Sequence, residues 1–415
     1  MISRDERQKQ AIQKWIANKG QGTIVGCTSF GKTYCAIRLI RALGEKYPNL
    51  DTLILVPTDA LRQQWKDLLT KHNLHARVEI MMGASRRETS CDLLVIDECH
   101  RASAQKISNI VNVVKYKMIL GLTATFERLD GRDAILAKYA PVVDTITLAE
   151  ASLNGWISKY TDYVVLIEPS DLEEYARLNA EFHECFSFFG FNFPLVMSLV
   201  GKKGFEAKKA YTSQICKNPD EWKDTLRNVT YYSVRFMQLL QRRKKYIATH
   251  PDKLRVAQRI IEKRPNSKII TFSSSVAIAE SFGNGYVYTG KEGKKKNRMS
   301  LDEFATQPTG ILHSCQLLNE GVSIPSVDVG IMLALNSSKT KAAQTLGRCL
   351  RLNGDTKHAE FFNLVLNHTV ECEWLRKSRN DSNYVVIDEE NLEKVLDYQP
   401  YSQYQYRLPS YLFRY

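Results

Sequence analysis

Residues 26–33, GCTSFGKT, contain two glycines five positions apart, with a lysine and a threonine directly after the second glycine. In a loop between a strand and a helix, Gly26 and Gly31 would let the backbone curl closely around phosphate oxygens. Lys32 could then reach the β- and γ-phosphates of a nucleotide, and the hydroxyl of Thr33 could bind Mg²⁺. The competing interpretation is an ordinary turn before a helix, so a phosphate loop requires a second site with a metal-binding acid.

Two adjacent carboxylates, Asp97 and Glu98, provide a candidate for that second site. They follow an apolar run at residues 93–96, which is typical of a buried parallel strand. Ligands bind at the carboxyl ends of the strands in such sheets. Asp97 would hold Mg²⁺, and Glu98 would orient and deprotonate an attacking water. A solvated strand end is the alternative, but a phosphate loop in the same α/β unit favours a nucleoside triphosphatase.

The elements that would position these residues alternate between short apolar strands and helical patterns. One set of candidate strands precedes Pro251 and a second set follows it. The candidate strands are residues 23–25, 53–56, 93–96, 118–122, 268–272, 285–288, 310–312 and 329–333. Strands that alternate with helices are typical of parallel sheets. The predicted fold class is therefore α/β, with two tandem parallel-sheet lobes and an aromatic, basic helical insert between them.

The same pattern predicts where the parts begin and end. We expect lobe 1 at residues 1–160, the insert at 161–250, lobe 2 at 251–377 and a tyrosine-rich C-terminal segment at 378–415. Within the insert, residues 229–247 have helical periodicity, with apolar residues on one face. The insert therefore predicts at least one long amphipathic helix.

Four segments resemble the motifs of superfamily 2 helicases in their order and spacing: GCTSFGKT, DECH at 97–100, LTAT at 122–125 and QTLGRCLR at 344–351. The segments LGLTATFERLDG and VPTDALRQQW are most similar to the DNA-translocating branch. That branch includes restriction-enzyme motor subunits, XPB-type helicases and the UvsW-like branch-migration helicases of bacteriophages, and the compact length favours the phage group. The resemblance implies two RecA-like lobes that bind ATP and Mg²⁺ between them and step along one nucleic-acid strand.

The resemblance also implies which residues bind the nucleotide. Gln8 lies in a segment similar to the Q motif, whose amide reads the adenine edge, although a surface glutamine is the alternative. Arg348 and Arg351, three residues apart on one helix face, would reach the γ-phosphate from lobe 2. The full set expected at the nucleotide, with Thr33 and Asp97 at the Mg²⁺, is Gln8, Gly26, Ser29, Gly31, Lys32, Thr33, Asp97, Glu98, Gly321, Arg348 and Arg351.

Other matched positions would contact the tracked strand or couple it to the ATP site. Pro57 and Thr58 resemble motif Ia, and Phe272 and Ser273 resemble motif IV; both motifs would contact the strand. The residues expected to couple the two sites are His100, Thr123, Thr125 and Gln344. Ser323 stands where many relatives have an aspartate, and the stretch 75–92 shows no clear motif Ib.

The insert is the candidate source of substrate choice. Arg235, Arg242 and Lys245 fall on the polar face of the predicted 229–247 helix, and we hypothesise that they contact a DNA arm outside the tracked strand. The alternative is a solvated helix face. Five phenylalanines at residues 186–193 favour core packing, with a wedge that stacks on a split base pair as the other interpretation.

The composition agrees with a nucleic-acid partner. The 415-residue chain has 58 lysines and arginines against 45 acidic residues, a net charge of +13, which favours a polyanion. The nine cysteines form no C-x-x-C pair, which predicts reduced thiols rather than a zinc site. No apolar run approaches membrane-spanning length, and the first residues lack the apolar core of a signal peptide. We expect a monomer without a membrane, located in the cytoplasm, or in the host cytoplasm if it is phage-encoded.

These observations predict an ATP-dependent superfamily 2 DNA helicase or translocase that acts on forked or branched DNA in replication, recombination or repair. An RNA helicase is the nearest alternative. A nucleic-acid-binding scaffold with weak ATPase activity is the alternative from another class, and the complete set Lys32, Asp97, Glu98, Arg348 and Arg351 argues against it.

Overall fold

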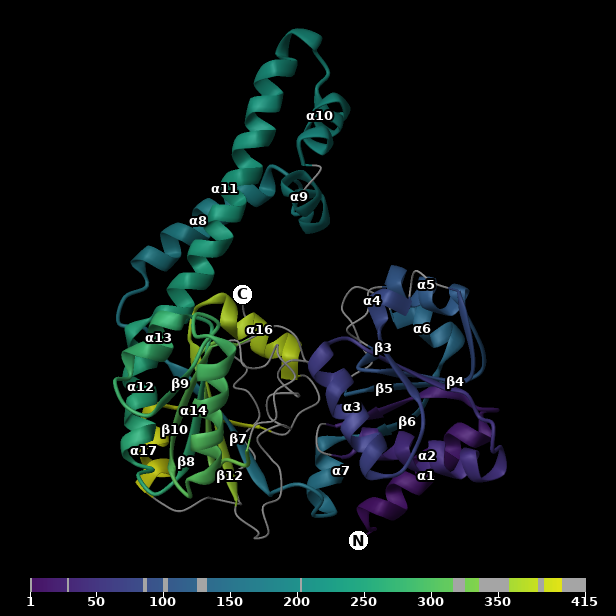
Figure 1. Ribbon diagram of the computed structural model, residues 1–415. Coiled ribbons are helices and arrows are strands. Elements are labelled where there is room, and N and C mark those ends of the chain that lie inside the picture. The colour runs from purple at the N-terminus through teal and green to yellow at the C-terminus, as the bar shows by residue number, and fades with distance from the viewer. Residues whose placement is uncertain are drawn as a thin grey trace.

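The computed structural model describes most of the chain. The described residues are 2–27, 30–84, 88–99, 104–124, 133–201, 204–315, 325–335, 358–379 and 384–397. They form two sheet-containing lobes that lie side by side and a helical arm that rises from the second lobe (Figure 1).

Lobe 1 is built on a six-stranded parallel sheet with the strand order β3-β2-β4-β5-β1-β6. Its strands are β1 (Gln21–Gly26), β2 (Thr52–Val56), β3 (Arg77–Ile80), β4 (Thr89–Asp97), β5 (Val114–Thr123) and β6 (Val142–Ile146). Strand β2 and the second half of β4 are apolar and buried, as expected for a parallel sheet covered by helices on both faces. The covering helices are α1 (Arg4–Ala17), α2 (Lys32–Lys46), α3 (Asp59–Lys71), α4 (Met81–Ala84), α5 (Ala104–Val113), α6 (Asp133–Tyr139) and α7 (Leu148–Leu153).

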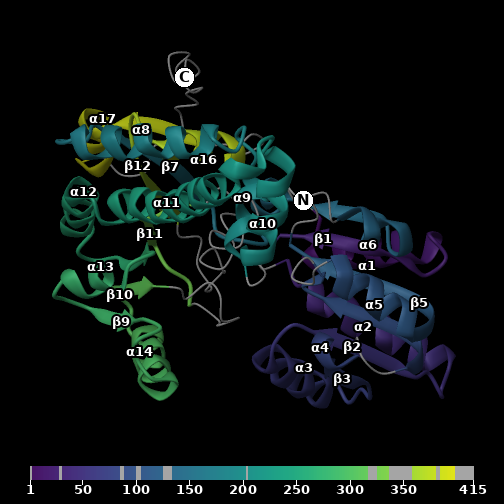
Figure 2. The ribbon, with the colours of Figure 1, turned by 90° about the horizontal axis from the view of Figure 1, so that it is seen from above.

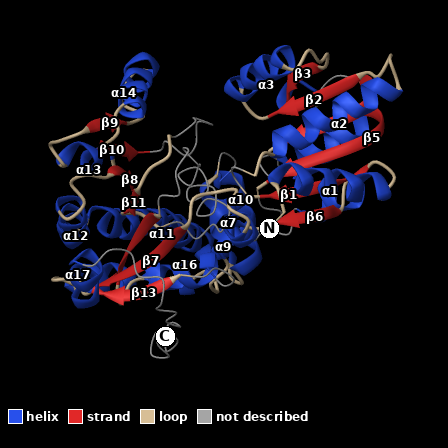
Figure 3. Cartoon of the chain, turned by 90° about the horizontal axis from the view of Figure 1, so that it is seen from below, coloured by secondary structure: helices blue, strands red, loops and turns tan. Residues whose placement is uncertain are grey.

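Lobe 2 is built on a seven-stranded parallel sheet with the order β13-β7-β12-β11-β8-β10-β9. Its strands are β7 (Tyr160–Ile167), β8 (Lys268–Ser273), β9 (Tyr286–Tyr288), β10 (Gly310–Cys315), β11 (Val329–Met332), β12 (Ala359–Leu366) and β13 (Val385–Asp388). The helices of this lobe are α12 (Pro251–Glu262), α13 (Val276–Ser281), α14 (Lys294–Thr306), α16 (Val370–Arg379) and α17 (Glu389–Asp397). Figure 3 shows the two separate sheets, each accompanied by its helices. The predicted fold class, two parallel-sheet α/β lobes, is confirmed.

The sheet of lobe 2 differs from the predicted boundaries at two places. Strand β7, expected at the start of the insert, pairs along its whole length with β12. Strand β13, expected in the C-terminal segment, pairs with the other side of β7. Both β7 and β12 are apolar runs buried on both faces, and periodicity cannot distinguish such runs from buried helix. Lobe 2 therefore includes chain from both sides of the insert.

The insert is a helical arm that leaves lobe 2 after β7 and returns at α12. Its elements are α8 (Glu173–Ser187), α9 (Phe193–Val200), α10 (Gly204–Ile215), the 3₁₀ helix η2 (Pro219–Glu221) and α11 (Trp222–Thr249). The long helix α11 rises away from lobe 2, and α9 and α10 lean toward lobe 1 (Figures 1 and 2). None of the described helices, including the 28-residue α11, is long and apolar enough to cross a bilayer.

The core of the insert forms between α8 and α11. Phe182, Phe189 and Phe236 are buried there, whereas Phe191 and Phe193 are largely exposed. The phenylalanine-rich segment therefore contributes to the core with only some of its rings. Arg243 is buried on the apolar side of α11, with its guanidinium 4.0 Å from the centre of the Phe182 ring. Such a cation–π contact partly compensates the loss of water around the charge.

The first residues of the insert are attached to lobe 2 by hydrogen bonds, and the last helix of the insert is bonded back to them. The hydroxyl of Tyr175, on α8, accepts from the backbone N–H of Val370 at 2.8 Å, at the start of α16. The backbone N–H of Ser170 donates to Asp252 Oδ2 at 2.7 Å, at the start of α12. The hydroxyl of Tyr246 donates to the Asp171 carbonyl. These bonds fix the direction in which the arm leaves the lobe.

A buried ion pair links α12 to α16 under this base. Lys253 Nζ lies 2.6 Å from Glu371 Oε2 and donates to the Leu333 carbonyl at 2.8 Å, and both side chains are almost completely buried. Glu371 also accepts from the Leu366 backbone N–H at 3.0 Å. Burial lowers the pKa of Lys253 and raises the pKa of Glu371, because desolvation disfavours both charges. Each charge is tolerated in the core only because the other is present.

Replacing Lys253 with methionine should therefore destabilise lobe 2 by about 3–5 kcal/mol, because Glu371 would remain buried without its counter-ion. Chemical unfolding followed by circular dichroism measures this change. The double variant Lys253→Met/Glu371→Leu should recover most of the loss. Lys263→Met, at the C-cap of α12, removes a solvent-accessible pair with Asp397 on α17 and should cost far less stability than Lys253→Met. Equal losses from Lys253→Met and Lys263→Met would contradict the prediction.

Candidate functional site

Gly26, Gly31 and Lys32, three residues of the expected phosphate loop between β1 and α2, lie close together in the described part of the chain, which omits residues 28 and 29. Gly31 caps α2 with a left-handed backbone, φ 89°, which a side chain would strain. A Cβ atom at Gly26 would lie 3.0 Å from Lys32 Cγ, so the loop and the lysine stem are already in close contact. Lys32 Nζ donates to the Gly26 carbonyl at 2.8 Å. Lys32 and Thr33 are the first residues of α2, whose first turn contains no acidic residue to oppose an anion.

Gln8, on α1, lies against this loop. Its Nε2 donates to the Phe30 carbonyl at 2.9 Å, and the side chain is buried. Its Oε1 is buried and has no hydrogen-bond partner among the described residues. An unpaired buried acceptor is costly unless a donor is supplied. The exocyclic amine of adenine is such a donor, so the amide fits the nucleotide base that the sequence predicts for it.

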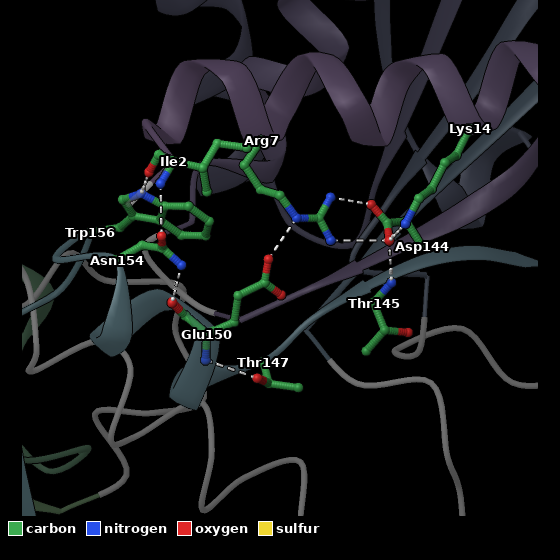
Figure 4. A network of polar contacts seen from close by, with 9 residues as sticks. All are labelled: Ile2, Arg7, Lys14, Asp144, Thr145, Thr147, Glu150, Asn154 and Trp156. Atoms are coloured by element: carbon green, nitrogen blue, oxygen red, sulfur yellow. Dashed lines mark hydrogen bonds and ion pairs between the residues drawn. The ribbon is translucent and has the colours of Figure 1, made fainter.

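A network of charged and polar contacts holds α1 in place (Figure 4). The guanidinium of Arg7, which is buried next to Gln8 in the chain, donates to both carboxylate oxygens of Asp144 on β6, and its Nε donates to Glu150 Oε1 at 2.6 Å on α7. Lys14 donates to the same carboxylate at 2.6 Å. Burial alone would raise the pKa of Asp144, but the bonds from Arg7 and Lys14 lower it below its usual value. No short sequence motif indicates this network, because its partners are far apart in the chain.

Asp97 and Glu98 lie at the end of β4, at the same edge of the sheet as the phosphate loop. Asp97 Oδ2 accepts from Trp65 Nε1 at 2.8 Å, and its Oδ1 accepts from the Glu98 backbone N–H at 2.9 Å. Burial and the neighbouring Glu98 charge raise the pKa of Asp97 to about 6, against lowering contributions from Trp65 and Lys32. Glu98 has a positive φ of 49°, a backbone conformation that is rare for this residue type and is often found at functional sites.

The acid pair and the loop are held at one edge by parallel register. Strand β5 lies between β4 and β1, with Asp97 opposite Leu122 and Val25 opposite Thr123. Thr123 is fully buried at the end of β5, so it stands between the carboxylates and the loop in the order of the strands. This placement is compatible with the coupling role expected for Thr123.

Trp65 is buried in the core of lobe 1, and its indole N–H also reaches the acid pair. It lies on α3, whose N-cap is Thr58; the Thr58 hydroxyl accepts from the Leu61 backbone N–H at 3.4 Å. Pro57 and Thr58 are half-buried, so both are accessible in part. A buried tryptophan needs a partner for its N–H, and this rule was the available signal for the Asp97 contact.

In lobe 2, the residues expected to contact the strand are mostly enclosed by protein. The ring of Phe272 is 4% exposed and packs in a hydrophobic core at the end of β8. Ser273 Oγ donates to the carbonyl of Ser275 at 2.9 Å. The side chain of Phe272 therefore offers no surface to a nucleic acid, which corrects the expectation for this residue.

The three insert cations do not share one environment. Arg235 forms an ion pair with Glu181 on α8 across the helix interface, so it is a structural contact rather than a free cation of the solvent face. Arg242 and Lys245 are exposed. The expected set of three is therefore reduced to two on the exposed face of α11.

Several predicted residues lie outside the described part of the chain: Ser29, His100, Thr125, Gly321, Gln344, Arg348 and Arg351. Their roles stay predictions. Among the described residues, no group of three or more acidic, histidine or cysteine side chains could hold a metal by itself. Mg²⁺ is commonly bound by one or two protein oxygens together with phosphate and water. Thr33 and Asp97 fit that kind of site.

Comparisons with known proteins match both lobes. A family model described as "Type III restriction enzyme, res subunit" matches residues 2–90 and 80–128, in lobe 1. A second model, "Helicase conserved C-terminal domain", matches residues 252–353, in lobe 2. The two models together match more than half of the chain.

Individual relatives extend over most of the chain. A DNA 3′–5′ translocase, XPB2, from Sulfurisphaera tokodaii is 24% identical over 403 residues, which is 90% of this chain and 83% of the translocase. Putative helicase 22 of a Sulfolobus islandicus filamentous virus is 22% identical and covers 91% of this chain, which spans 66% of the viral protein. The crystal structure of the Pyrococcus furiosus Hef helicase domain has a TM-score of 0.52 at 16% identity, covers 91% of this chain and is itself covered completely.

The two family models, one on each lobe, and the DNA translocase relative over 90% of the chain support a superfamily 2 DNA helicase, an enzyme driven by ATP.

Proposed function

We propose that this helicase hydrolyses ATP at the phosphate loop of lobe 1 and translocates along one strand of forked or branched DNA. The proposal rests on the convergence of Gln8, Lys32 and Asp97 at that loop. Gln8 bonds to the Phe30 carbonyl, Lys32 bonds to the Gly26 carbonyl, and Lys32 lowers the pKa of Asp97 through its charge.

Each residue at this site has a task that its position allows. Lys32 would exchange the Gly26 carbonyl for phosphate oxygens, and Gln8 would accept from adenine through Oε1. Glu98 would take a proton from the attacking water. Thr33 and Asp97 would hold Mg²⁺, which neutralises charge on the phosphates when it is bound. Trp65 holds Asp97 Oδ2 so that Oδ1 and the Glu98 backbone keep their orientation.

The remaining tasks are assigned from the motif resemblance. Arg348 and Arg351 would approach the γ-phosphate from lobe 2 when the lobes close. Gly321 and Ser29 would line the nucleotide, and His100, Thr125 and Gln344 would link it to the strand. We also propose that this helicase is related to the UvsW-like phage helicases. It would act as a monomer, in recombination or repair. The archaeal relative is a DNA 3′–5′ translocase, so 3′-to-5′ movement is the first direction to test.

The test of the overall proposal is ATP hydrolysis measured side by side with single-stranded DNA, duplex DNA, forked DNA and RNA. Strongest stimulation by forked DNA supports the proposal. Strongest stimulation by RNA would instead favour an RNA helicase, and no hydrolysis with any of them would favour a binding scaffold.

Replacing Lys32 with alanine should reduce ATP turnover at least about 10²-fold, because a positioned charge on the transferred phosphate is lost. Folding and DNA binding should persist, since Lys32 contacts the loop and not the core. Turnover is measured by phosphate release. Lys46→Ala, at the exposed far end of the same helix, is the matched control and should behave like wild type. Near-normal ATP turnover in Lys32→Ala would show that this segment is not the phosphate loop.

The variant Glu98→Gln should bind ATP with normal affinity and hydrolyse it about 10²–10⁴-fold more slowly, because an amide cannot accept the proton of the water. Equilibrium binding of a fluorescent ATP analogue and single-turnover hydrolysis separate the two effects. Glu45→Gln on the exposed side of α2 serves as the control. A wild-type rate in Glu98→Gln would assign the base to another residue.

The exposed face of α11 carries the proposal for the second DNA arm. Residues 225–249 contain no aspartate or glutamate, so no acidic side chain of this stretch opposes a phosphate. Arg242 and Lys245 lie on that exposed face, one turn of helix apart. Two cations so placed can contact neighbouring phosphates of one backbone.

The double variant Arg242→Gln/Lys245→Gln should weaken binding to forked DNA and flatten the dependence of log affinity on log salt by about 0.9 for each lost phosphate contact. Stimulation of the ATPase by single-stranded DNA should survive, because the lobes are unchanged. Arg235→Gln, whose cation is paired with Glu181, is the matched control and should leave the salt slope unchanged. Equal losses on single-stranded and forked DNA would contradict a separate arm contact.

A further inference from the structure

Trp156 lies in the short connection between the two lobes. Helix α7, the last helix of lobe 1, ends at Leu153, and β7, the first strand of the lobe 2 sheet, begins at Tyr160. Trp156 is 4% exposed, although a connection between two lobes would ordinarily run over the surface. Its burial shows that the connection is packed into lobe 1.

The side chain that covers Trp156 belongs to the phosphate loop. The rings of Phe30 and Trp156 have centroids 5.7 Å apart and are tilted by 46°, a favourable aromatic arrangement. Phe30 is completely buried, and its carbonyl is the acceptor for Gln8 Nε2. One residue of the loop thus contacts both the adenine-reading amide and the connection to lobe 2.

Residues near the start of α1 also hold Trp156 (Figure 4). Its indole N–H donates to the Ile2 carbonyl at 3.0 Å, and the Arg4 guanidinium donates to the Trp156 carbonyl. The Ile2 backbone N–H donates to Asn154 Oδ1 at 3.0 Å, and Asn154 Nδ2 donates to the Glu150 carbonyl at 3.0 Å. Ile2 and Arg4 belong to the same segment as Gln8, so these bonds join the connection to the helix that positions Gln8.

We propose that Trp156 is a positioning residue that transmits the state of the nucleotide site to the connection into lobe 2. Binding of a nucleotide changes the partners of Gln8 and of the loop that contains Phe30. Because packed rings rearrange in discrete steps rather than deform smoothly, a shift of Phe30 displaces the Trp156 ring. The backbone that follows Trp156 enters β7 directly, so the displacement reaches the sheet of lobe 2.

The inference rests on the proposed use of this site for ATP hydrolysis, and it predicts a separation of two quantities. Trp156→Ala should bind a non-hydrolysable ATP analogue, and hydrolyse ATP without DNA, within about threefold of wild type, since the described contacts of Trp156 are with Phe30, Ile2 and Arg4 and not with Lys32 or the acid pair. The stimulation of hydrolysis by single-stranded DNA should fall about tenfold, within the usual range of a coupling between two sites.

Conservative variants distinguish this role from a merely structural one. Trp156→Phe keeps a ring against Phe30 and should retain most of the stimulation. Trp15→Phe is the matched control, because Trp15 is also buried in lobe 1 and its N–H donates to the Ile119 carbonyl at 2.9 Å. Trp15→Phe should lower the melting temperature without changing the stimulation. If Trp156→Ala does not fold, Arg4→Met removes one contact to Trp156 from a half-buried position and should lower the stimulation in the same direction.

Small-angle X-ray scattering gives a readout that does not depend on turnover. With the ATP analogue and single-stranded DNA, the wild-type chain should become more compact, and Trp156→Ala should bind the analogue but stay extended. Wild-type stimulation in Trp156→Ala, or loss of analogue affinity in proportion to the rate, would overturn the proposal. A wild-type chain without DNA-stimulated hydrolysis would instead overturn the proposed function, and the coupling with it.

Discussion

The parallel pairing of β4, β5 and β1 determines where the groups of the nucleotide site lie. All three strands end at the same edge of the sheet, so Gly26, Asp97 and Thr123 come together although they are far apart in the chain. A shift of one residue in this register would turn Asp97 toward the opposite face. The helices then refine what the sheet has placed. Trp65 on α3 holds one oxygen of Asp97, and Gln8 on α1 holds the loop carbonyl.

Much of the fold could be predicted because buried parallel strands and the loops after them have strong local patterns. The extent of lobe 2 could not, since β7 is defined by its pairing with β12 from the far side of the insert. Helical periodicity predicts that Arg235 lies on the polar face of its helix. It cannot show that Glu181, on another helix, forms an ion pair with it. The burial of Phe272 was missed for a similar reason, because a strand end is enclosed by elements that only the tertiary structure supplies.

The candidate site shows the same limit in a different form. Local motifs suggested the groups that would touch the nucleotide, but not the residues that hold those groups. Arg7, Trp65 and Trp156 each act on partners distant in sequence, and none belongs to a short motif. The first residues of the insert are fixed to α12 and α16 in the same way, by the contacts of Ser170 with Asp252 and of Tyr175 with Val370, and α11 is followed by α12 after a single residue. The arm should therefore turn together with lobe 2, and its basic helix should move with the motor rather than independently of it.

Lobe 2 is built from two stretches of chain, one before the insert and one after it, and this affects how the protein folds during synthesis. Strand β7 ends at Ile167, and its partner β12 begins only at Ala359. At ribosomal rates of roughly 5–20 residues per second, β7 is synthesised about 10–40 s before it can pair with β12. During that interval an apolar strand with two open edges waits in the nascent chain, which is the kind of segment that chaperones bind and that aggregates with other copies. The helical insert, which is completed in the meantime, forms its own core next to this strand and could shelter it until the second half of the sheet arrives.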